Sequence, residues 1–356
     1  MPNRRALLID GNQIDDSTDA FIVAEIGHNH QGDVEKCKEM FRVAKECGVD
    51  AVKLQKRDNR GLYTRAMYDK PYDHENSFGA TYGEHREALE FGWDEYGELQ
   101  RYSRQIGLTF FATAFDLPSA EFLARLDIPA IKVASGDLKT LPLLRRVAEL
   151  GKPMIVSTGG ATLEDIERAY ETIVPANPQL CFLQCTAAYP AAPEELNLNV
   201  IATLRRRFPE LVIGLSDHEN GIVMAVAAYV LGARVIEKHF TLNHTWKGTD
   251  HAFSLEPIGL RKLVRDLRRM RVALGNGIKC PLPSEQAPIR KMGKKLVAAR
   301  PLPAGHVLTA QDIAMKSPAD GLSARFWDQV VGATLLRGLA YEEDISFDHL
   351  ARGEAE

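Results

Sequence analysis

The chain has 356 residues, with 44 Lys and Arg against 48 Asp and Glu, and a formal net charge of −4. This balance excludes a basic nucleic-acid-binding surface, and no apolar run is long enough to span a membrane. The N-terminus lacks the apolar core of a signal peptide. The five cysteines lack the paired spacing of a zinc site or a disulfide framework. We therefore expect a cytoplasmic enzyme that has neither nucleic acid nor a membrane as its partner.

Strand-like apolar segments alternate with helical segments from about residue 21 to 280. The predicted strands are 21–27, 51–56, 108–115, 130–135, 154–159, 181–186, 211–218 and 235–240. Helical periodicity lies between them, with Asp33 and Thr140 as candidate N-caps and glycines as stops. Eight such units predict an α/β fold, a closed (β/α)8 TIM barrel. An open, doubly wound sheet is the alternative, although six or seven units would favour it more.

The composition changes after Gly275, where proline and polar residues become frequent. We expect a barrel domain over 1–280, a linker over 281–290 and a C-terminal domain over 291–356. Short apolar runs broken by Gly and Pro make this last domain a small β-rich module. A module of this size is only marginally stable alone, so we expect it to dock on the barrel or on a partner subunit.

Polar residues gather where the predicted strands end, which is where TIM barrels place their active sites. They are Glu25, Lys53, Gln55, Thr113, Asp116, Lys132, Ser135, Ser157, Thr158, Gln184, Thr186, Tyr189, Ser216, His218, Glu237 and His239. Random surface polarity would scatter such groups over both ends of the strands. The pattern therefore predicts an active site at the C-terminal mouth of the barrel.

The residue types at this mouth indicate a metal and an anion. His218 and His239 lie at matched positions on adjacent strands and could share Mn²⁺, Mg²⁺ or Zn²⁺, with Asp217 and Glu237 nearby. The alternative is that each histidine is a hydrogen-bonded residue of the rim. Lys53 and Lys132 suit a phosphate or carboxylate. A lysine that forms a Schiff base is the other interpretation.

The long segment between Lys56 and Asp94 is expected to be functional because it lies at the barrel mouth. Within it, Tyr82, His85 and Arg86 could meet a phosphate or a polyol tail. Alternatively the segment is a folded lid whose charges are solvated or paired. The aromatic residues that follow it are expected only to pack a helix, and they are Phe91, Trp93, Tyr96 and Tyr102.

A set of motifs resembles the sialic acid synthase family, the N-acetylneuraminate and N-acylneuraminate-9-phosphate synthases. In chain order these are AEIGHNHQGD, VKLQK, IKVASGD, STGG, FLQCTAAYP, GLSDHE, EKHFTL and WKGTDHAFSLEP. The segments PYDHENSFGATYGEHREALEF and TWKGTDHAFSLEP are most similar to the 9-phosphate branch. The tail KKLVAARPLPAGHVLTAQDIAMKSPADG resembles the antifreeze-like SAF domain, a β-clip fold. The resemblance covers nearly the whole chain.

The resemblance implies condensation of phosphoenolpyruvate with an N-acylmannosamine or its 6-phosphate, which gives a sialic acid or its 9-phosphate plus phosphate. It implies a divalent metal on His218 and His239, most often Mn²⁺, with Mg²⁺ or Co²⁺ possible. It also implies a domain-swapped homodimer. The implied phosphoenolpyruvate contacts are Lys53, Thr113, Lys132, Ser135, Ser157 and Ser216. The implied contacts to the sugar or the catalytic water are Glu25, Gln55, Asp137, Tyr189, Glu237 and Asp250.

Two positions depart from the family pattern and weaken the case for an unphosphorylated sugar. Ala187 stands where many bacterial members have Asn, and Ser317 stands where free-sugar synthases have Arg. A synthase for a related acid of the legionaminic or KDN type is one alternative. A second is a metal hydrolase that uses the HNH run at 28–30, and a third is a sugar- or ice-binding module without catalytic activity.

Overall fold

The computed structural model describes residues 5–351. The chain divides into two compact units, one ending at Gly275 and the other beginning at Asn276. The first unit therefore ends at Gly275 rather than at the predicted residue 280. None of the helices in the described part of the chain is long and apolar enough to cross a membrane.

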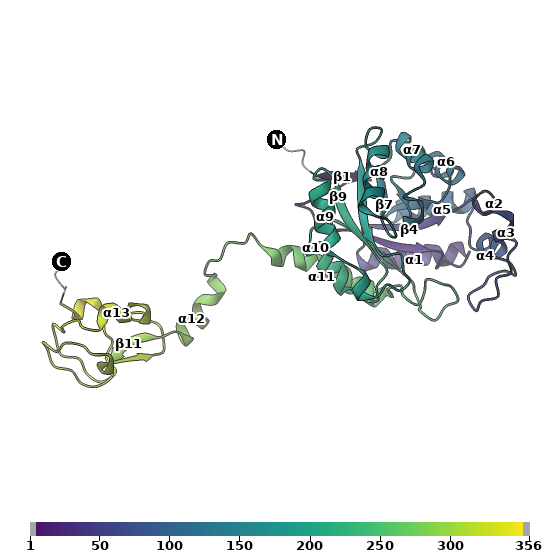
Figure 1. The fold of residues 1–356 in the computed structure, drawn as a ribbon. Coiled ribbons are helices and arrows are strands. Elements are labelled where there is room, and N and C mark those ends of the chain that lie inside the picture. Colours follow the sequence, from purple (N-terminus) through teal and green to yellow (C-terminus); the bar gives the residue numbers. More distant parts are fainter. Residues whose placement is uncertain (1–4, 352–356) are drawn as a thin grey trace. The chain divides into compact units, whose positions relative to one another are not determined.

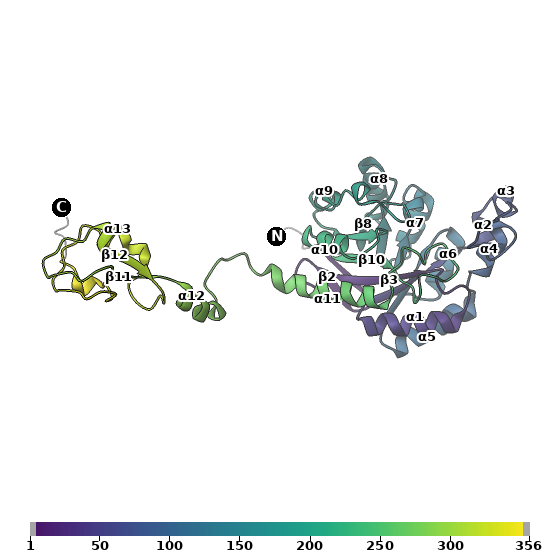
Figure 2. The same ribbon diagram turned by 90° about the horizontal axis from the view of Figure 1, so that it is seen from below.

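The first unit is a closed barrel of parallel strands wrapped by helices (Figures 1 and 2). The strands close in the order β10, β3, β4, β5, β6, β7, β8, β9. Their bounds are β3 Phe21–Gly27, β4 Ala51–Lys56, β5 Thr109–Ala114, β6 Ile131–Val133, β7 Met154–Ser157, β8 Leu180–Cys185, β9 Val212–Asp217 and β10 Val235–His239. The predicted TIM barrel is confirmed, and the open-sheet alternative is excluded.

The strands are buried along their whole length, as expected for a parallel sheet that is covered by helices. The register between them decides which side chains meet at the barrel mouth. Glu25 of β3 lies opposite Lys53 of β4, and Gln55 lies opposite Thr113 of β5. Glu237 of β10 lies opposite Ser216 of β9. The strand register alone, without any contribution from the loops, thus brings together polar and charged groups that are far apart in sequence.

The helices follow from amphipathic sequences with ordinary end signals. Their bounds are α1 Val34–Cys47, α5 Trp93–Gln105, α6 Leu117–Arg125, α7 Leu141–Glu149, α8 Leu163–Ile173, α9 Asn199–Arg207, α10 Val223–Val230 and α11 Pro257–Leu274. Asp33 caps α1 by accepting a hydrogen bond from the Lys36 amide, as predicted. Gly48 ends it at φ 90°, a left-handed conformation that suits glycine. Thr140 precedes α7 but makes no side-chain capping bond.

Two parts of the first unit were not expected from the sequence. An antiparallel hairpin, β1 (Ala6–Ile9) with β2 (Asn12–Asp15), precedes the barrel. Its turn residue Asp10 accepts a hydrogen bond from Thr109 at the start of β5, 2.9 Å away, so it lies at the N-terminal end, opposite the site. The segment after β4 folds into the short helices α2 (Asn59–Leu62), α3 (Arg65–Tyr68) and α4 (Tyr82–Ala88), which lie together in both views (Figures 1 and 2).

The second unit has its own small apolar core, built around a two-stranded antiparallel sheet. Its elements are η3 Pro283–Glu285, α12 Gln286–Met292, β11 Lys295–Ala298, β12 Ile313–Lys316 and α13 Trp327–Val330, with further short 3₁₀ turns. The predicted linker over 281–290 therefore contains helical turns, and Pro283 stands at the first position of one of them, where proline is tolerated. The β-rich character of this unit agrees with the prediction.

Asp312 is the polar centre of the second unit, because its buried carboxylate is enclosed by donors. Its oxygens accept from Arg300 Nε at 2.9 Å, from the Thr309 amide at 2.9 Å and from His306 Nε2 at 2.8 Å. We expect Asp312→Ala to lower the unfolding free energy of this unit by about 2–3 kcal/mol, since buried donors lose their acceptor. Scanning calorimetry of the full chain measures this, with the exposed Asp348→Ala as control. Equal melting of the two variants would contradict the assignment.

Candidate active site

A cavity of about 490 Å³ opens at the C-terminal ends of the barrel strands. Of the residues singled out from the sequence as catalytic or substrate-binding, it is lined by Glu25, Lys53, Gln55, Arg86, Thr113, Lys132, Ser135, Ser157, Tyr189, Ser216, His218, Glu237, His239 and Asp250. They come from all eight barrel strands or the segments that follow them. Strand-end polarity was therefore a sound guide to which side chains converge.

The first buried pair in this cavity is Lys53 with Glu25. Lys53 Nζ lies 2.5 Å from Glu25 Oε2 and 2.7 Å from Thr113 Oγ1. Gln55 Nε2 donates to the other oxygen of Glu25, at 2.6 Å. Burial of two charges is tolerated here because each has a partner of opposite sign. Both oxygens of Glu25 are therefore held in place.

The second buried pair is Lys132 with Glu237. Lys132 Nζ lies 3.2 Å from Glu237 Oε1 and 2.7 Å from Ser157 Oγ. Ser216 Oγ donates to the same carboxylate oxygen at 3.0 Å, and Lys53 Nζ is 4.0 Å from Glu237 Oε2. Burial raises the pKa of Glu237, but Lys132 and Lys53 outweigh it and hold that pKa below its ordinary range. Glu237 is therefore ionised.

Two lysines thus face two carboxylates in one buried site. A Schiff base starts from a neutral amine in an apolar pocket or beside another cation. Lys53 and Lys132 lie instead at ion-pair distance from Glu25 and Glu237. The geometry favours the electrostatic interpretation of these lysines over the covalent one.

His218 and His239 face each other across β9 and β10, with ring centroids 5.4 Å apart and planes at 62°. Nδ1 of His218 donates to the carbonyl of Thr186 at 2.8 Å, which leaves Nε2 with a lone pair. Burial and the neighbouring His239 lower the pKa of His218 to about 3, so its ring is neutral. Nδ1 of His239 is buried without a hydrogen-bond partner. The neutral ring of His218 and the unpartnered Nδ1 of His239 fit a divalent metal.

The other side chains that lie near these two imidazoles are aromatic or acidic. The ring of Tyr189 lies 4.2 Å from that of His218, and the ring of Phe253 lies 4.9 Å from that of His239. Asp250 Oδ2 is 3.7 Å from His239 Nδ1. Among residues 5–351, no group of three or more His, Cys, Asp or Glu side chains is placed to hold a metal. A metal held by this pair alone would keep coordination positions for substrate and water.

Three residues predicted to bind substrate do not line the cavity. His85 is buried beside Tyr72, and its Nδ1 accepts from the Phe78 amide at 3.1 Å. The hydroxyl of Tyr82 accepts from Arg86 Nη2 at 2.9 Å and so lies behind that arginine. Asp137 ends a 3₁₀ turn, where it accepts from Thr140 Oγ1 at 3.3 Å, and burial raises its pKa to about 6.

Arg57 lines the cavity, although the sequence did not single it out. It follows directly after Lys56, the last residue of β4, and its guanidinium stacks on the Phe115 ring at 3.6 Å. Its position one residue beyond a strand end was the available signal. His28, from the HNH run after β3, lines the same cavity.

The HNH run does not form the metal site that a hydrolase would need. The rings of His28 and His30 are 6.0 Å apart, and His30 stacks on Phe91 with centroids 4.1 Å apart. The side-chain Nδ2 of Asn29 donates to the Phe240 carbonyl at 2.9 Å. His30 and Asn29 are therefore structural residues that join the loop after β3 to its neighbours.

Because His30 is buried, we expect the stability of the protein to depend on pH. Burial lowers its pKa to about 3, far below the ordinary value of 6.5. Between pH 6.5 and 4 the unfolded chain binds a proton at this ring that the folded chain does not bind. The unfolding free energy should therefore fall on acidification, by up to about 1.4 kcal/mol per pH unit for this ring. Urea unfolding at several pH values measures it. His30→Gln should flatten the dependence, and an unchanged slope would contradict the assignment.

Comparison with known proteins agrees with this geometry. The NeuB family model matches residues 40–279, and the SAF domain model matches residues 295–351. Human N-acetylneuraminate-9-phosphate synthase is 46% identical over 83% of this chain and 82% of its own. N,N'-diacetyllegionaminic acid synthase of Campylobacter jejuni is 34% identical over 91% of this chain and 97% of its own.

A solved structure is also similar to this chain. N-acetylneuraminic acid (sialic acid) synthetase from Leptospira borgpetersenii, in complex with citrate, superposes with a TM-score of 0.70. It is 31% identical and covers 80% of this chain and 95% of its own. The expected resemblance is confirmed, and the chain is an enzyme that belongs to the NeuB family and carries a SAF domain.

Proposed function

We propose that this enzyme condenses phosphoenolpyruvate with an N-acylmannosamine 6-phosphate to give an N-acylneuraminate 9-phosphate and inorganic phosphate. The observation that carries the proposal is one cavity in which two buried lysines lie beside two neighbouring histidine rings. The name of the human relative supports a phosphorylated product. Ala187 and Ser317 point the same way, since many bacterial members of the family have Asn at the first position and free-sugar synthases have Arg at the second.

In this proposal Lys53 and Lys132 hold the phosphate and carboxylate of phosphoenolpyruvate. Hydroxyl donors surround them, because Ser157 and Thr113 already contact the two ammonium groups at 2.7 Å. Ser135 Oγ lies near the same wall and accepts from the Gly159 amide at 3.0 Å. Ammonium groups and neutral donors fixed in a buried site stabilise an anion without needing to reorganise during the reaction.

A divalent cation, Mn²⁺ in this proposal, would bind His218 and His239 and supply Lewis acidity toward the aldehyde oxygen of the open-chain sugar. The two rings are suited to this because each keeps a nitrogen free of protein partners. Asp250 is placed beside His239 to orient either that ring or the sugar. Tyr189, stacked on His218, would pack against the carbon chain of the sugar.

The bond changes follow from these positions. C3 of phosphoenolpyruvate attacks the aldehyde carbon, which forms the new carbon–carbon bond, leaves positive charge at C2 and turns the aldehyde oxygen into an alkoxide. Water adds to C2, and one of its protons passes to Glu25, whose two oxygens are fixed by Gln55 and Lys53, and from there to the alkoxide. The bond between C2 and the bridging oxygen then breaks while the new hydroxyl on C2 becomes the keto group and gives its proton to the departing phosphate, whose charge the lysines stabilise. Glu237 holds Lys132 in position throughout.

The direct test is turnover. Phosphoenolpyruvate, N-acetylmannosamine 6-phosphate and Mn²⁺ should together release one phosphate for each nine-carbon acid formed. Parallel reactions with N-acetylmannosamine, mannose 6-phosphate and the legionaminic acid precursor separate the alternatives, the last being favoured by the Campylobacter relative. Phosphate release with none of these acceptors would contradict the proposal.

We also propose that the enzyme is a homodimer in which the SAF-containing unit of one chain covers the barrel of its partner. The small core of that unit supports this, because so few buried residues give little stability in isolation. Light scattering should give twice the mass of one chain. A mass equal to one chain at working concentration would contradict it.

A further inference from the structure

The active-site cavity holds a second cluster of positive charge besides the two lysines. Arg57 and Arg86 both line it, one after β4 and the other on α4. The two guanidinium groups lie on either side of His28. Arg57 Nη1 is 3.1 Å from His28 Nε2, and Arg86 Nη1 is 3.3 Å from His28 Nδ1.

His28 cannot satisfy both arginines. Burial, Arg57 and Arg86 lower the pKa of His28 well below its usual range, so the ring is neutral. A neutral imidazole has one N–H and one lone pair, whereas both of its nitrogens face guanidinium donors here. Turning the His28 ring over does not remove the conflict, because each arginine would still face one of its two nitrogens. One guanidinium is therefore left with a donor that has no acceptor, and the buried Nε of Arg57 also lacks a partner.

No carboxylate neutralises these two arginines at ion-pair distance within residues 5–351. Arg57 Nη2 donates to Gln55 Oε1 at 2.7 Å, and Arg86 Nη2 donates to the hydroxyl of Tyr82 at 2.9 Å. Glu90 and Asp250 act on the arginines only at longer range. A buried and a partly buried cation that lie beside each other without neutralisation are costly, so the cluster is built for an anion that arrives with the ligand.

The guanidinium cluster is separate from the lysine site. A hydrogen-bonded chain leads from Lys53 to Glu25, from Glu25 to Gln55 and from Gln55 to Arg57. Two side chains therefore lie between the ammonium and the first guanidinium. The lysines are already matched by two carboxylates, while the arginines are not. The cavity thus has two anion sites that differ in chemistry as well as in position.

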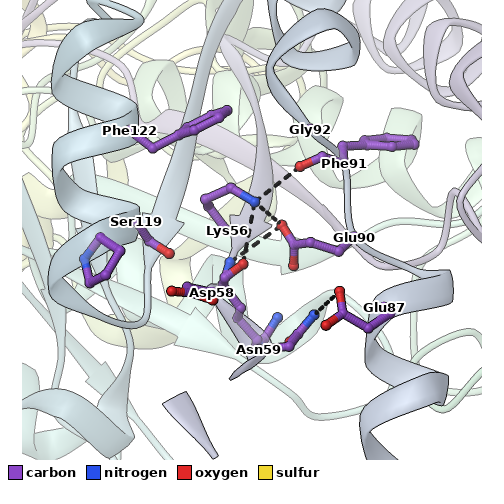
Figure 3. A pocket seen from close by; sticks show the side chains of 11 residues that line it. Lys56, Asp58, Asn59, Glu87, Glu90, Phe91, Gly92, Ser119 and Phe122 are labelled. Carbon is purple, nitrogen blue, oxygen red and sulfur yellow. Dashed lines mark hydrogen bonds and ion pairs between the residues drawn. The ribbon is translucent and has the colours of Figure 1, made fainter. Parts of the chain in front are cut away.

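The segment that carries these arginines is anchored from outside the cavity. Figure 3 shows Lys56 pointing toward Glu90 and the Phe91 carbonyl. Lys56 Nζ lies 2.7 Å from Glu90 Oε1 and 3.0 Å from Phe91 O, which ties the end of β4 to the chain after α4. Gly83 lets the Tyr68 ring pack on α4, since a Cβ atom there would come within 2.4 Å of that ring. The backbone that carries both arginines is therefore fixed by hydrogen bonds and side-chain packing.

We propose that Arg57 and Arg86 bind the phosphate at the far end of the acceptor sugar. The planar, forked guanidinium matches a phosphate dianion, and its two parallel hydrogen bonds fix both distance and orientation. A sugar hydroxyl would leave the two charges uncompensated. The assignment deepens the proposed function and rests on it. It adds Arg57 to the site and gives His28 the role of keeping the guanidiniums apart.

The test compares kcat/KM for N-acetylmannosamine 6-phosphate and for N-acetylmannosamine in three proteins. These are the wild type, Arg86→Gln and Arg65→Gln. Arg65 is a matched control because it lies in the same segment with its side chain 93% exposed. In Arg86→Gln the ratio of the two values, phosphorylated over free, should fall by about tenfold to a hundredfold, as expected for the loss of charge-assisted hydrogen bonds. In Arg65→Gln the ratio should stay that of the wild type.

Two results would overturn the assignment. One is an equal fall of kcat/KM for both acceptors, which means a merely structural role. The other is a rise in the KM for phosphoenolpyruvate at a constant ratio, which means that the arginines bind that substrate instead. If Arg86→Gln does not fold, Arg86→Lys keeps the charge without the fork and should still lower the ratio.

Calorimetric binding of N-acetylmannosamine 6-phosphate without phosphoenolpyruvate separates this proposal from the function itself. Arg86-dependent binding in a wild type that turns over no acceptor would uphold the subsite and contradict the synthase proposal. Equal affinity of the wild type and Arg86→Gln for the phosphorylated sugar would contradict the subsite alone.

Discussion

Lys132→Met should lower kcat/KM for the condensation by roughly 30-fold to 900-fold, which corresponds to about 2–4 kcal/mol of lost transition-state stabilisation. The reason is that Lys132 Nζ is buried at the cavity wall, 2.7 Å from Ser157 Oγ, where phosphoenolpyruvate would place negative charge. Methionine keeps the length of the side chain and removes only the cation. Steady-state kinetics of phosphate release measures the loss.

The substitution also leaves Glu237 without its nearest cation, and a buried carboxylate that loses its partner destabilises a protein by about 3–5 kcal/mol. Lys132→Met/Glu237→Gln should restore the melting temperature but not the activity. Lys139→Met is the control, because Lys139 is exposed and pairs with Asp165 outside the cavity. Activity of Lys132→Met within a few fold of the wild type would rule out electrostatic binding by this lysine.

His239→Ala should abolish measurable turnover and weaken Mn²⁺ binding by at least about 100-fold, since even outer partners of a metal ligand are worth 10–100-fold. The imidazole of His239 presents a buried nitrogen without a protein partner and lies directly opposite His218. Removing it leaves a single protein ligand from that pair. Electron paramagnetic resonance titration of Mn²⁺ reports binding independently of activity.

His74→Ala provides the control for this experiment, because His74 is exposed and does not line the cavity. It should bind Mn²⁺ and turn over substrate as the wild type does. Circular dichroism should show that His239→Ala remains folded, since that ring makes no hydrogen bond in the protein. Wild-type activity after exhaustive chelation would contradict a Lewis-acid role for any metal at this pair.

The barrel could be predicted from the sequence because its strands are continuous apolar runs with polar ends. The run 235–240 shows why, since Glu237, Lys238 and His239 interrupt an apolar segment and the period of two puts Glu237 and His239 on one face. The register then pairs Glu237 with Ser216 and Glu25 with Lys53. The alternation along each strand and the closure of the barrel place the same side chains at the mouth. Most of the residues that line the cavity could therefore be predicted from the sequence.

The segment after β4 could not be predicted in the same way, because its helices are short and their rotation is set by contacts distant in sequence. His85 and Arg86 are adjacent on α4, and consecutive helical residues point about 100° apart. Contacts such as the packing of Tyr68 on Gly83 and the hydrogen bond from the Phe78 amide to His85 fix α4, so that Arg86 lines the cavity while His85 does not. Arg57 stands between Lys56 and Asp58, so in sequence it looks like part of a solvated charged run.

A crystal structure of the enzyme with Mn²⁺ and phosphoenolpyruvate tests the central claim most directly. We expect an anomalous manganese peak within bonding distance of one nitrogen of His218 and one of His239. We also expect the phosphate of the substrate against Lys53 and Lys132, with the guanidiniums of Arg57 and Arg86 left for the second substrate. A metal bound elsewhere, or that phosphate lodged between the two arginines while both lysines stay closed on their glutamates, would contradict it.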